Sequence, residues 1–167
     1  MEFLEIINET VDEFEAIART LFDNYAIQTD NALYRFVEIE FYWNSTNHID
    51  NSTYQRKHVD PKSGDWFFHF SGVDIALRNE QTGGYGGILI RKIYDINSEK
   101  IINGPMVCAM KLFSCTNAFK ETIKTKIVSY GFSKSEIFKD NRIGLGKNAQ
   151  ENGADKLTYR FFIDPKK

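Results

Sequence analysis

The chain has 167 residues, a length that predicts one domain whose core needs no disulfides or metal. Three prolines and 11 glycines exclude a collagen-like or disordered chain. No apolar run approaches the roughly 18 residues of a membrane span, and the first residues do not resemble a signal peptide. We therefore expect a cytoplasmic protein that does not contact a membrane. Cys108 and Cys115 form no CxxC pair, and fit reduced thiols better than a disulfide framework or a zinc site.

The net charge of −2 is distributed unevenly along the chain. Residues 1–30 carry eight acidic side chains and Arg19 as their one base, a charge of −7, which leaves +5 for residues 31–167. A basic body behind an acidic leading segment is compatible with nucleic-acid binding. A solvated surface of mixed sign explains the charge alone equally well.

The first predicted element is an amphipathic helix over residues 10–25. Thr10 and Glu13 have the spacing of a capping box, and apolar residues then recur at helical spacing as far as Tyr25. The pair Asp30–Asn31 is predicted to form the turn that leads out of this helix.

Residues 33–43 are rich in aromatic and β-branched side chains and predict a long strand. One face of this strand, which we expect in the core, holds Val37, Ile39, Phe41 and Trp43. The other face holds Phe36, Glu38, Glu40 and Tyr42. Two carboxylates bracketed by aromatic rings are unusual on a solvent-facing surface, so this second face is the first candidate for a functional site.

The rest of the chain predicts a polar loop followed by short strands and helices. A loop as long as residues 44–64 is usually functional or disordered in a compact domain. The glycines of residues 82–87 predict a turn with Tyr85 at its tip. Strands are predicted near residues 66–71, 73–78, 88–94, 142–145 and 157–163, and helices over residues 106–113 and 117–129. The pattern is that of a strand-rich α+β domain.

Glu40 is the strongest candidate for chemistry. A carboxylate among aromatic residues is partly desolvated, which raises its pKa and suits it to act as a general base. Arg91 would pair with it if the two strands that carry them are neighbours. A half-exposed strand glutamate paired with a lysine or arginine is the alternative.

Histidines and glycines give weaker signals. His58 and His69 could each stack on a base, hold a phosphate or pack in the core. No HxxxH or HExxH spacing is present, so we predict no metal site. The glycine-rich segment lacks the ending of a P-loop, which leaves a plain hairpin or a backbone that approaches a ligand near Tyr85.

Five short motifs occur between residues 34 and 163. They are Val-Glu-Ile-Glu-Phe-Tyr at 37–42, Gly64 before an aromatic strand, Ile-Leu-Ile-Arg at 88–91, Gly-Pro at 104–105 before a short apolar helix, and Arg-Ile-Gly-Leu at 142–145 with Arg-Phe-Phe at 160–162. Together and in this order they resemble the alkyladenine (3-methyladenine) DNA glycosylases. The resemblance implies a single α+β domain over residues 1–167, with a curved, mostly antiparallel sheet, flanking helices and an acidic N-terminal helix within residues 1–30.

The resemblance also implies an activity. Such an enzyme flips a damaged purine out of DNA and hydrolyses its N-glycosidic bond, as a monomer and without metal or other cofactor. Glu40 matches the glutamate that activates the attacking water, and Arg91 matches the arginine that positions this water. Tyr42 matches the tyrosine that stacks on the flipped base.

Further substrate-binding residues are implied less directly. His58 is the candidate pocket histidine, and Tyr85 and His69 are candidate contacts to the substrate. Asp74 stands nearest to an asparagine-containing segment of the family, where a negative charge would alter base selection. The tyrosine-rich wedge of the family is not recognisable, and His69 and Phe70 stand near that stretch.

Three functions remain open after this comparison. The leading expectation is a glycosylase acting on damaged duplex or single-stranded DNA. The alternatives are a non-catalytic protein that binds nucleic acid or a nucleotide on the same fold, and an N-glycoside hydrolase for a small nucleotide.

Overall fold

A computed structural model describes residues 2–57, 61–114, 119 and 123–166. Its strands are β1 (Tyr25–Gln28), β2 (Leu33–Asn44), β3 (Trp66–His69), β4 (Gly72–Asn79), β5 (Gly84–Asp95), β6 (Lys100–Asn103), β7 (Lys126–Ser129), β8 (Phe138–Asp140) and β9 (Arg160–Phe162). Its helices are α1 (Val11–Asn24), α2 (Pro105–Phe113) and α3 (Lys147–Glu151), with 3₁₀ turns η1 (Glu2–Leu4), η2 (Asn51–Lys57) and η3 (Ala154–Lys156). None of the described helices is long and apolar enough to cross a membrane.

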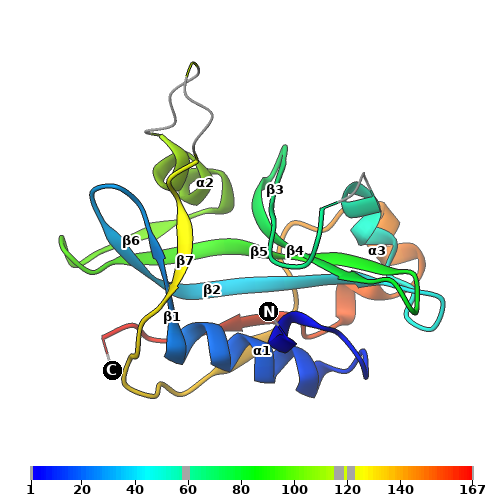
Figure 1. Ribbon diagram of the computed structural model, residues 1–167. Helices are drawn as coiled ribbons and strands as arrows, with labels where there is room; N and C mark the ends of the chain where they lie inside the picture. The colour runs from blue at the N-terminus through cyan, green and yellow to red at the C-terminus, as the bar shows by residue number, and fades with distance from the viewer. Residues whose placement is uncertain (1, 58–60, 115–118, 120–122, 167) are drawn as a thin grey trace.

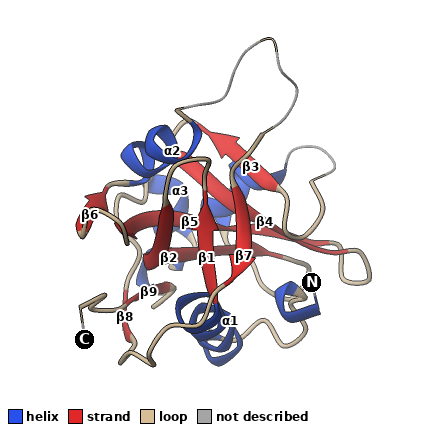
Figure 2. Ribbon diagram, turned by 60° about the vertical axis from the view of Figure 1, so that its left-hand side comes forward, coloured by secondary structure: helices blue, strands red, loops and turns tan. Residues whose placement is uncertain are grey.

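The strands form one curled antiparallel sheet in the order β3-β4-β5-β2-β1-β7 (Figure 2), to which β6 adds beside β5, and β9 beside β2 and β8. Helix α1 covers one side of the sheet, whereas α2, α3 and β3 lie on the other side (Figure 1). This arrangement confirms the prediction of a single α+β domain with a mostly antiparallel sheet. The finer likeness to the glycosylase fold stays a prediction.

The leading helix forms as its capping signal predicts. The hydroxyl of Thr10 accepts a hydrogen bond from the Glu13 backbone N–H at 3.3 Å, and the Glu13 carboxylate accepts the N–H groups of residues 7–9. The predicted exit is wrong, because Tyr25 already belongs to β1. Asp30–Asn31 lies in the hairpin between β1 and β2, closed by a bond from the Thr29 N–H to the Ala32 carbonyl. Strand β1 has only four residues, which are too few for its alternation to be distinguished from the end of the helical pattern.

Strand β2 is central to the core and is buried on both faces. Phe41 stacks on Phe14 of α1 with ring centroids 4.9 Å apart, and Ile39 and Trp43 are fully buried. The opposite face is also buried, since Glu40 has no exposed surface and Glu38 is 5% exposed. The long strand and the burial of its two carboxylates are therefore confirmed. The predicted faces are wrong at the start of the strand, where Phe36 and not Val37 belongs to the hydrophobic core cluster, because the register shifts between Phe36 and Glu38.

The pairing of β2 with β5 contains two compensating irregularities. Phe36 pairs with Ile93 and Glu38 pairs with Lys92, so Val37 is an extra residue on β2. Ile39 then pairs with Ile90, so Arg91 is an extra residue on β5 and the original register returns. Bulges bend strands and redirect side chains. Here they place Arg91 between two carboxylates of β2.

The predicted glycine turn is wrong, because Gly84 and Gly86 lie inside β5. A Cβ atom at Gly84 would collide with the indole of Trp43, and one at Gly86 would collide with the Tyr42 carbonyl. These glycines therefore allow β5 to lie close against β2. The actual turn precedes them, at residues 80–83.

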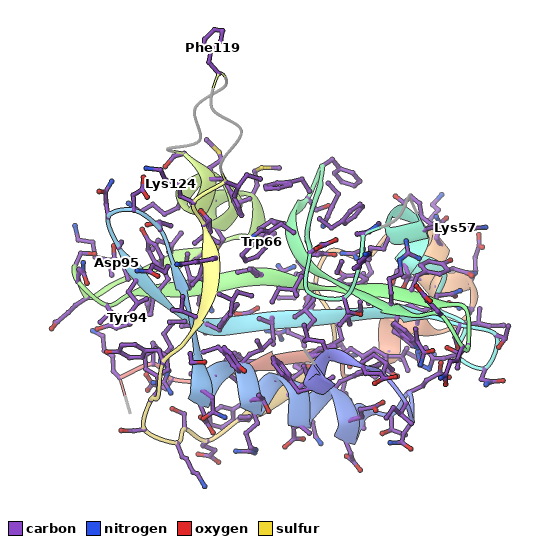
Figure 3. The ribbon with its side chains drawn as sticks, in the orientation of Figure 1. Lys57, Trp66, Tyr94, Asp95, Phe119 and Lys124 are labelled. Carbon is purple, nitrogen blue, oxygen red and sulfur yellow. The ribbon has the colours of Figure 1, made fainter. Side chains whose placement is uncertain are left out.

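Two other predicted elements also need correction. Residues 126–129 of the predicted second helix form β7, where Ile127 pairs with Ile27. This pairing supplies hydrogen-bond partners to the backbone groups along the free edge of β1, which a helix at these residues would leave unpaired by this segment. Phe119 is 97% exposed and lies far from the sheet (Figure 3), while residues 115–118 and 120–122 lie outside the described residues. Residues 142–145 form an irregular segment rather than a strand, and Gly144 in it has a φ of +75°.

Candidate active site

A fully buried carboxylate, that of Glu40, lies at the centre of the candidate site. Its Oε2 accepts hydrogen bonds from the Tyr42 hydroxyl at 2.9 Å and from Arg91 Nη1 at 3.2 Å. Its Oε1 accepts a bond from the Ile143 backbone N–H at 2.8 Å. A carboxylate offers about four acceptor positions, so these three donors leave room for one more, such as a water.

Burial determines the direction of the Glu40 titration. Removal from water raises the pKa of Glu40 above its ordinary value, and this effect outweighs the opposing influence of Arg91, the Ile143 N–H, Tyr42 and Arg142. A carboxyl with a raised pKa is a stronger base than an exposed one. Burial therefore makes this carboxylate a better proton acceptor than a solvent-exposed glutamate.

Arg91 is held by the strand bulge rather than by regular pairing. Its backbone carbonyl accepts bonds from the Gly104 N–H at 2.9 Å and from the Cys108 thiol at 3.4 Å. Its Nε lies 3.5 Å from Glu38 but has no hydrogen-bond partner among the described residues. An unsatisfied buried donor beside a reactive carboxylate is a place where a water or substrate oxygen would be bound.

Cys108 contributes to this support and not to chemistry. Burial raises the pKa of its thiol to about 12, so the thiolate does not form near neutral pH. The expectation of an unreactive thiol is confirmed for Cys108, and Cys115 lies outside the described residues.

Tyr42 is buried beneath two cations. The guanidinium carbons of Arg56 and Arg142 lie 3.6 and 4.6 Å from the centre of its ring, and 5% of the residue is exposed. Burial and the neighbouring Glu40 raise the pKa of Tyr42, so its hydroxyl stays a donor. The stacking role implied for this ring would require the arginines to move, and it stays a prediction.

The irregular segment after β8 is anchored by Arg142. Arg142 Nη1 donates to the Asp50 carboxylate at 2.6 Å and to the Phe41 carbonyl at 3.1 Å, and Nη2 donates to the Ala154 carbonyl at 2.8 Å. Both members of the Arg142–Asp50 pair are completely buried. This anchor fixes the next residue, whose backbone N–H is directed at Glu40.

A second buried ion pair lies beside Tyr42. Arg56 Nε donates to Asp74 Oδ2 at 2.6 Å, and His69 Nε2 lies 2.9 Å from Asp74 Oδ1. Burial alone would raise the pKa of Asp74, but Arg56 and His69 outweigh it and hold the pKa below its ordinary value. The negative charge of Asp74, which the sequence analysis expected near the substrate, is thus paired with Arg56.

A cavity of about 280 Å³ opens next to this cluster. Its walls combine aromatic, cationic and hydroxyl side chains with the loop before α3, and include Tyr42, Tyr54, Arg56, Phe70, Ser71 and Lys147. Leu89, which pairs with Glu40 across β2 and β5, also lines it. Glu40 itself is not among the lining residues, but its neighbours Leu89 and Tyr42 are.

The predicted site residues are only partly brought together. Tyr42 and Arg91 both donate hydrogen bonds to Glu40, and Asp74 with His69 lies behind Arg56. Lys57 at the end of η2 (Figure 3) is the last described residue before His58, which lies outside the described residues.

Tyr85 does not line the main cavity. It lines a neighbouring cavity of about 300 Å³ that shares Tyr54 and Asn148 with the first. Its ring also lies 5.6 Å from the Arg78 guanidinium. A direct role in holding the same ligand as Tyr42 stays a prediction.

Sequence reasoning missed Arg56 as a site residue. It lies in a polar loop without periodicity, and nothing in that loop indicates that an arginine will be 4% exposed. Arg142 belongs to one of the recognised motifs but was assigned to a strand. Its buried partner, Asp50, could have been suspected only from the loop's length.

The chain is similar to a mimivirus protein over part of its length. No protein-family profile matches the sequence. A relative described as uncharacterized protein L759 of Acanthamoeba polyphaga mimivirus is 33% identical over 126 residues, which cover 60% of this chain and 56% of the relative. The chain thus spans just over half the length of that relative. Neither comparison indicates an alkyladenine glycosylase.

Proposed function

We propose that this protein is a monofunctional DNA glycosylase that hydrolyses the N-glycosidic bond of a damaged purine flipped out of DNA. The observation that carries the proposal is the state of Glu40. It is buried, its pKa is raised, and three fixed donors orient it beside a cavity with aromatic walls. Such a group is costly to bury and is characteristic of a catalytic base.

The proposed step needs only water and the substrate. Glu40 accepts a proton from a water molecule while the water oxygen forms a bond to C1′ of the sugar. The bond from C1′ to the base nitrogen breaks, and its electron pair leaves with the base, which takes up one proton from solvent. Protonated Glu40 then returns its proton to solvent. The transition state carries positive charge on the sugar, so an ionised carboxylate close to it also stabilises that charge.

Arg91 has a positioning role in this step. Its Nη1 holds Glu40, and its unsatisfied Nε is available for the attacking water or a nearby phosphate oxygen. Tyr42 holds the same carboxylate oxygen from the other donor. Together these contacts would orient one lone pair of Glu40 toward the water.

Access by DNA is supported by the layout of the surface. The acidic helix α1 lies across the sheet from α2, α3 and β3 (Figure 1), so its charge does not flank the cavity. Phe70 follows the end of β3, lines the cavity and is 75% exposed. An exposed aromatic ring beside a pocket can stack on a neighbouring base after one base is flipped out. Lys147 at the start of α3 adds a positive charge to the same wall.

A non-catalytic binding protein on this fold is the competing proposal. The observation in its favour is that Glu40 has no exposed surface, so a water must first gain access to it. A hydrolase for a small nucleotide would use the same groups with a different substrate.

Single-turnover base release tests these proposals. Duplexes containing hypoxanthine, ethenoadenine or 3-methyladenine are incubated with excess protein, and free base and abasic sites are both measured. The glycosylase proposal expects release, with DNA binding that weakens steeply as salt rises. Binding without release supports the non-catalytic alternative. Failure to bind any duplex at low salt refutes the DNA-repair proposal.

A further inference from the structure

Arg56 is an unusual residue in the wall of the main cavity. The residue is 4% exposed, and its Nε is fixed by Asp74, which is itself completely buried between Arg56 and His69. The guanidinium also lies over the Tyr42 ring at 3.6 Å. Contacts with a carboxylate and an aromatic ring hold this group in one orientation.

The other side of the same guanidinium is open to the cavity wall. Asp74 binds the Nε side, and Arg56 lines the cavity. Among the residues that the structure describes, none accepts a hydrogen bond from either Nη group of Arg56. A guanidinium fixed in this way presents its remaining donors as a planar fork. The two Nη groups can therefore donate to a ligand that offers two acceptors to this wall.

The rest of the cavity restricts the shape of that ligand. A volume of about 280 Å³ is at the small end of ligand pockets, and the walls include Tyr54 and Phe70. A single flat ring system fits such walls better than a whole nucleotide does. A planar guanidinium fork matches adjacent acceptors on a ring edge, as in bidentate contacts to the O6 and N7 atoms of guanine.

We propose that Arg56 is a specificity residue that selects a neutral 6-oxopurine, such as hypoxanthine, by donating to its O6 and N7 atoms. This inference rests on the proposed function and narrows its substrate class. Adenine and its derivatives present an amino group in place of O6, so one donor of the fork would face another donor. Asp74 acts through Arg56 as a positioning residue, because it holds the fork and does not itself line the cavity.

The charge of the wall adds a second kind of selection. Purines methylated at N3 or N7 carry a positive charge as DNA nucleotides, and N7 methylation also blocks one acceptor. Arg56 and Lys147 both line the cavity, and Arg142 lies over the same tyrosine ring as Arg56. Asp74 pairs with Arg56 but does not line the cavity, so a bound base meets the positive end of this pair. Like charges in a poorly solvated site repel. Cationic alkylated purines, which the family resemblance alone would favour, should therefore bind less well than neutral ones.

The first test compares substrates that differ at one position. Oligonucleotides carry hypoxanthine, unsubstituted purine or adenine opposite an abasic analogue, so that base pairing does not distinguish them. The wild-type protein is compared with Arg56→Lys, which keeps a positive charge beside Asp74 but loses the fork. A bidentate contact discriminates by roughly 5- to 150-fold. We expect the ratio of hypoxanthine to purine release to fall about tenfold or more in the variant, because purine offers the fork only N7 and so loses less than hypoxanthine does. Equal ratios in the two proteins overturn the proposal.

The charge argument has its own variant. Arg56→Gln combined with Asp74→Asn removes both charges of the pair and so leaves no unpaired buried ion. Arg56→Lys is the reference, because it also lacks the fork but keeps the charge. We expect release of 7-methylguanine relative to hypoxanthine to be about tenfold or more higher in the double variant than in Arg56→Lys. Equal ratios in these two variants refute selection by the charge of Arg56.

Binding of free bases to the wild-type protein separates this inference from the proposed function and does not depend on the folding of a variant. Calorimetric titration with free hypoxanthine, purine and adenine measures recognition without any bond cleavage. Tenfold or tighter binding of hypoxanthine than of either other base supports the inference, even if no DNA is cleaved. Equal affinities, or displacement of hypoxanthine by millimolar inorganic phosphate, overturn it, because the fork would then hold a phosphate.

Discussion

The replacement Glu40→Gln is the most informative perturbation of the proposed active site. The amide keeps the size of the side chain, and one oxygen can still accept the Ile143 N–H. The new NH₂ group replaces the oxygen that accepts from both Tyr42 and Arg91, and it can donate to the Tyr42 hydroxyl once that hydroxyl turns. It still faces the Arg91 donor, whose guanidinium keeps its ionic contact with Glu38 at 3.5 Å. Loss of one charged hydrogen bond costs about 1.5–3 kcal/mol, and relief from burying a charge offsets part of it. The protein should therefore remain folded, with a free energy of unfolding lowered by no more than about 2 kcal/mol.

The effect on catalysis should be much larger than the effect on folding. A positioned general base contributes about 10²–10⁴ in rate, equivalent to about 2.7–5.4 kcal/mol of transition-state stabilisation. We expect single-turnover base release by Glu40→Gln to fall by that factor, with unchanged affinity for the damaged duplex. Circular dichroism and urea denaturation of the same samples establish that the fold is retained.

Glu38→Gln is a matched control for this experiment. Glu38 lies two residues earlier on β2, is 5% exposed and contacts Arg91 as well, but its main partners are Lys92 at 2.7 Å and Arg160 at 3.3 Å. We expect its replacement to lower the rate less than about tenfold. Equal losses in the two variants, or a Glu40→Gln protein with a third of the wild-type rate, would refute the assignment of the catalytic base.

The pH dependence follows from the same carboxyl. Because the pKa of Glu40 is raised in the folded protein, its basic form is lost at a higher pH than for an exposed glutamate. The rate should therefore fall as the pH drops through this raised pKa and reach a plateau above it. The residual rate of Glu40→Gln should lack that acid limb.

Three further predictions concern the surroundings of the site. In Tyr42→Phe, loss of a donor that lowers the pKa of the catalytic carboxyl should move the acid limb of the rate profile to higher pH, and an unmoved or lower midpoint would contradict the reasoning. Arg142→Met should cost about 3–5 kcal/mol of unfolding free energy in urea, because Asp50 is left buried and unpaired, and adding Asp50→Asn should recover part of it. Gly86→Ala should cost about 1–3 kcal/mol through collision with a β2 carbonyl, whereas Gly131→Ala, whose Cβ meets no atom within 4 Å, should be neutral or stabilise by up to about 1 kcal/mol.

The sequence predicted those elements whose signal is local. The capped helix, the aromatic strand β2 and the short helix after Gly104–Pro105 follow from capping, alternation and proline position, and all three are present. The edge strands β6, β7 and β8 were missed or misassigned, since three or four residues gain their hydrogen bonds from a partner that is distant in the chain.

The candidate site was predictable in chemistry but not in geometry. The aromatic neighbours of Glu40 on β2 predicted a partly desolvated carboxylate, which the structure shows to be fully buried, and the strand of Arg91 was recognised. The orientation of Arg91 depends on a strand bulge that the residue types at these positions do not predict. Arg56 became a cavity residue only because Asp74, 18 positions away, holds its Nε. Long-range ion pairs of this kind leave no local pattern in a sequence.

The two bulges suggest why a buried ionic site is tolerated in the centre of this sheet. Regular pairing would alternate side chains strictly between faces, and the extra residues at Val37 and Arg91 interrupt that alternation. Their carbonyls leave the β2–β5 ladder to accept bonds from Ile163 and Gly104, so the irregular backbone is satisfied by β9 and α2 rather than by water. The position of the Arg91 guanidinium against Glu40 is therefore set by packing on both sides of the sheet. A site fixed in this way gains little freedom to relax, which is the condition under which a buried carboxylate keeps a raised pKa and remains available for proton transfer.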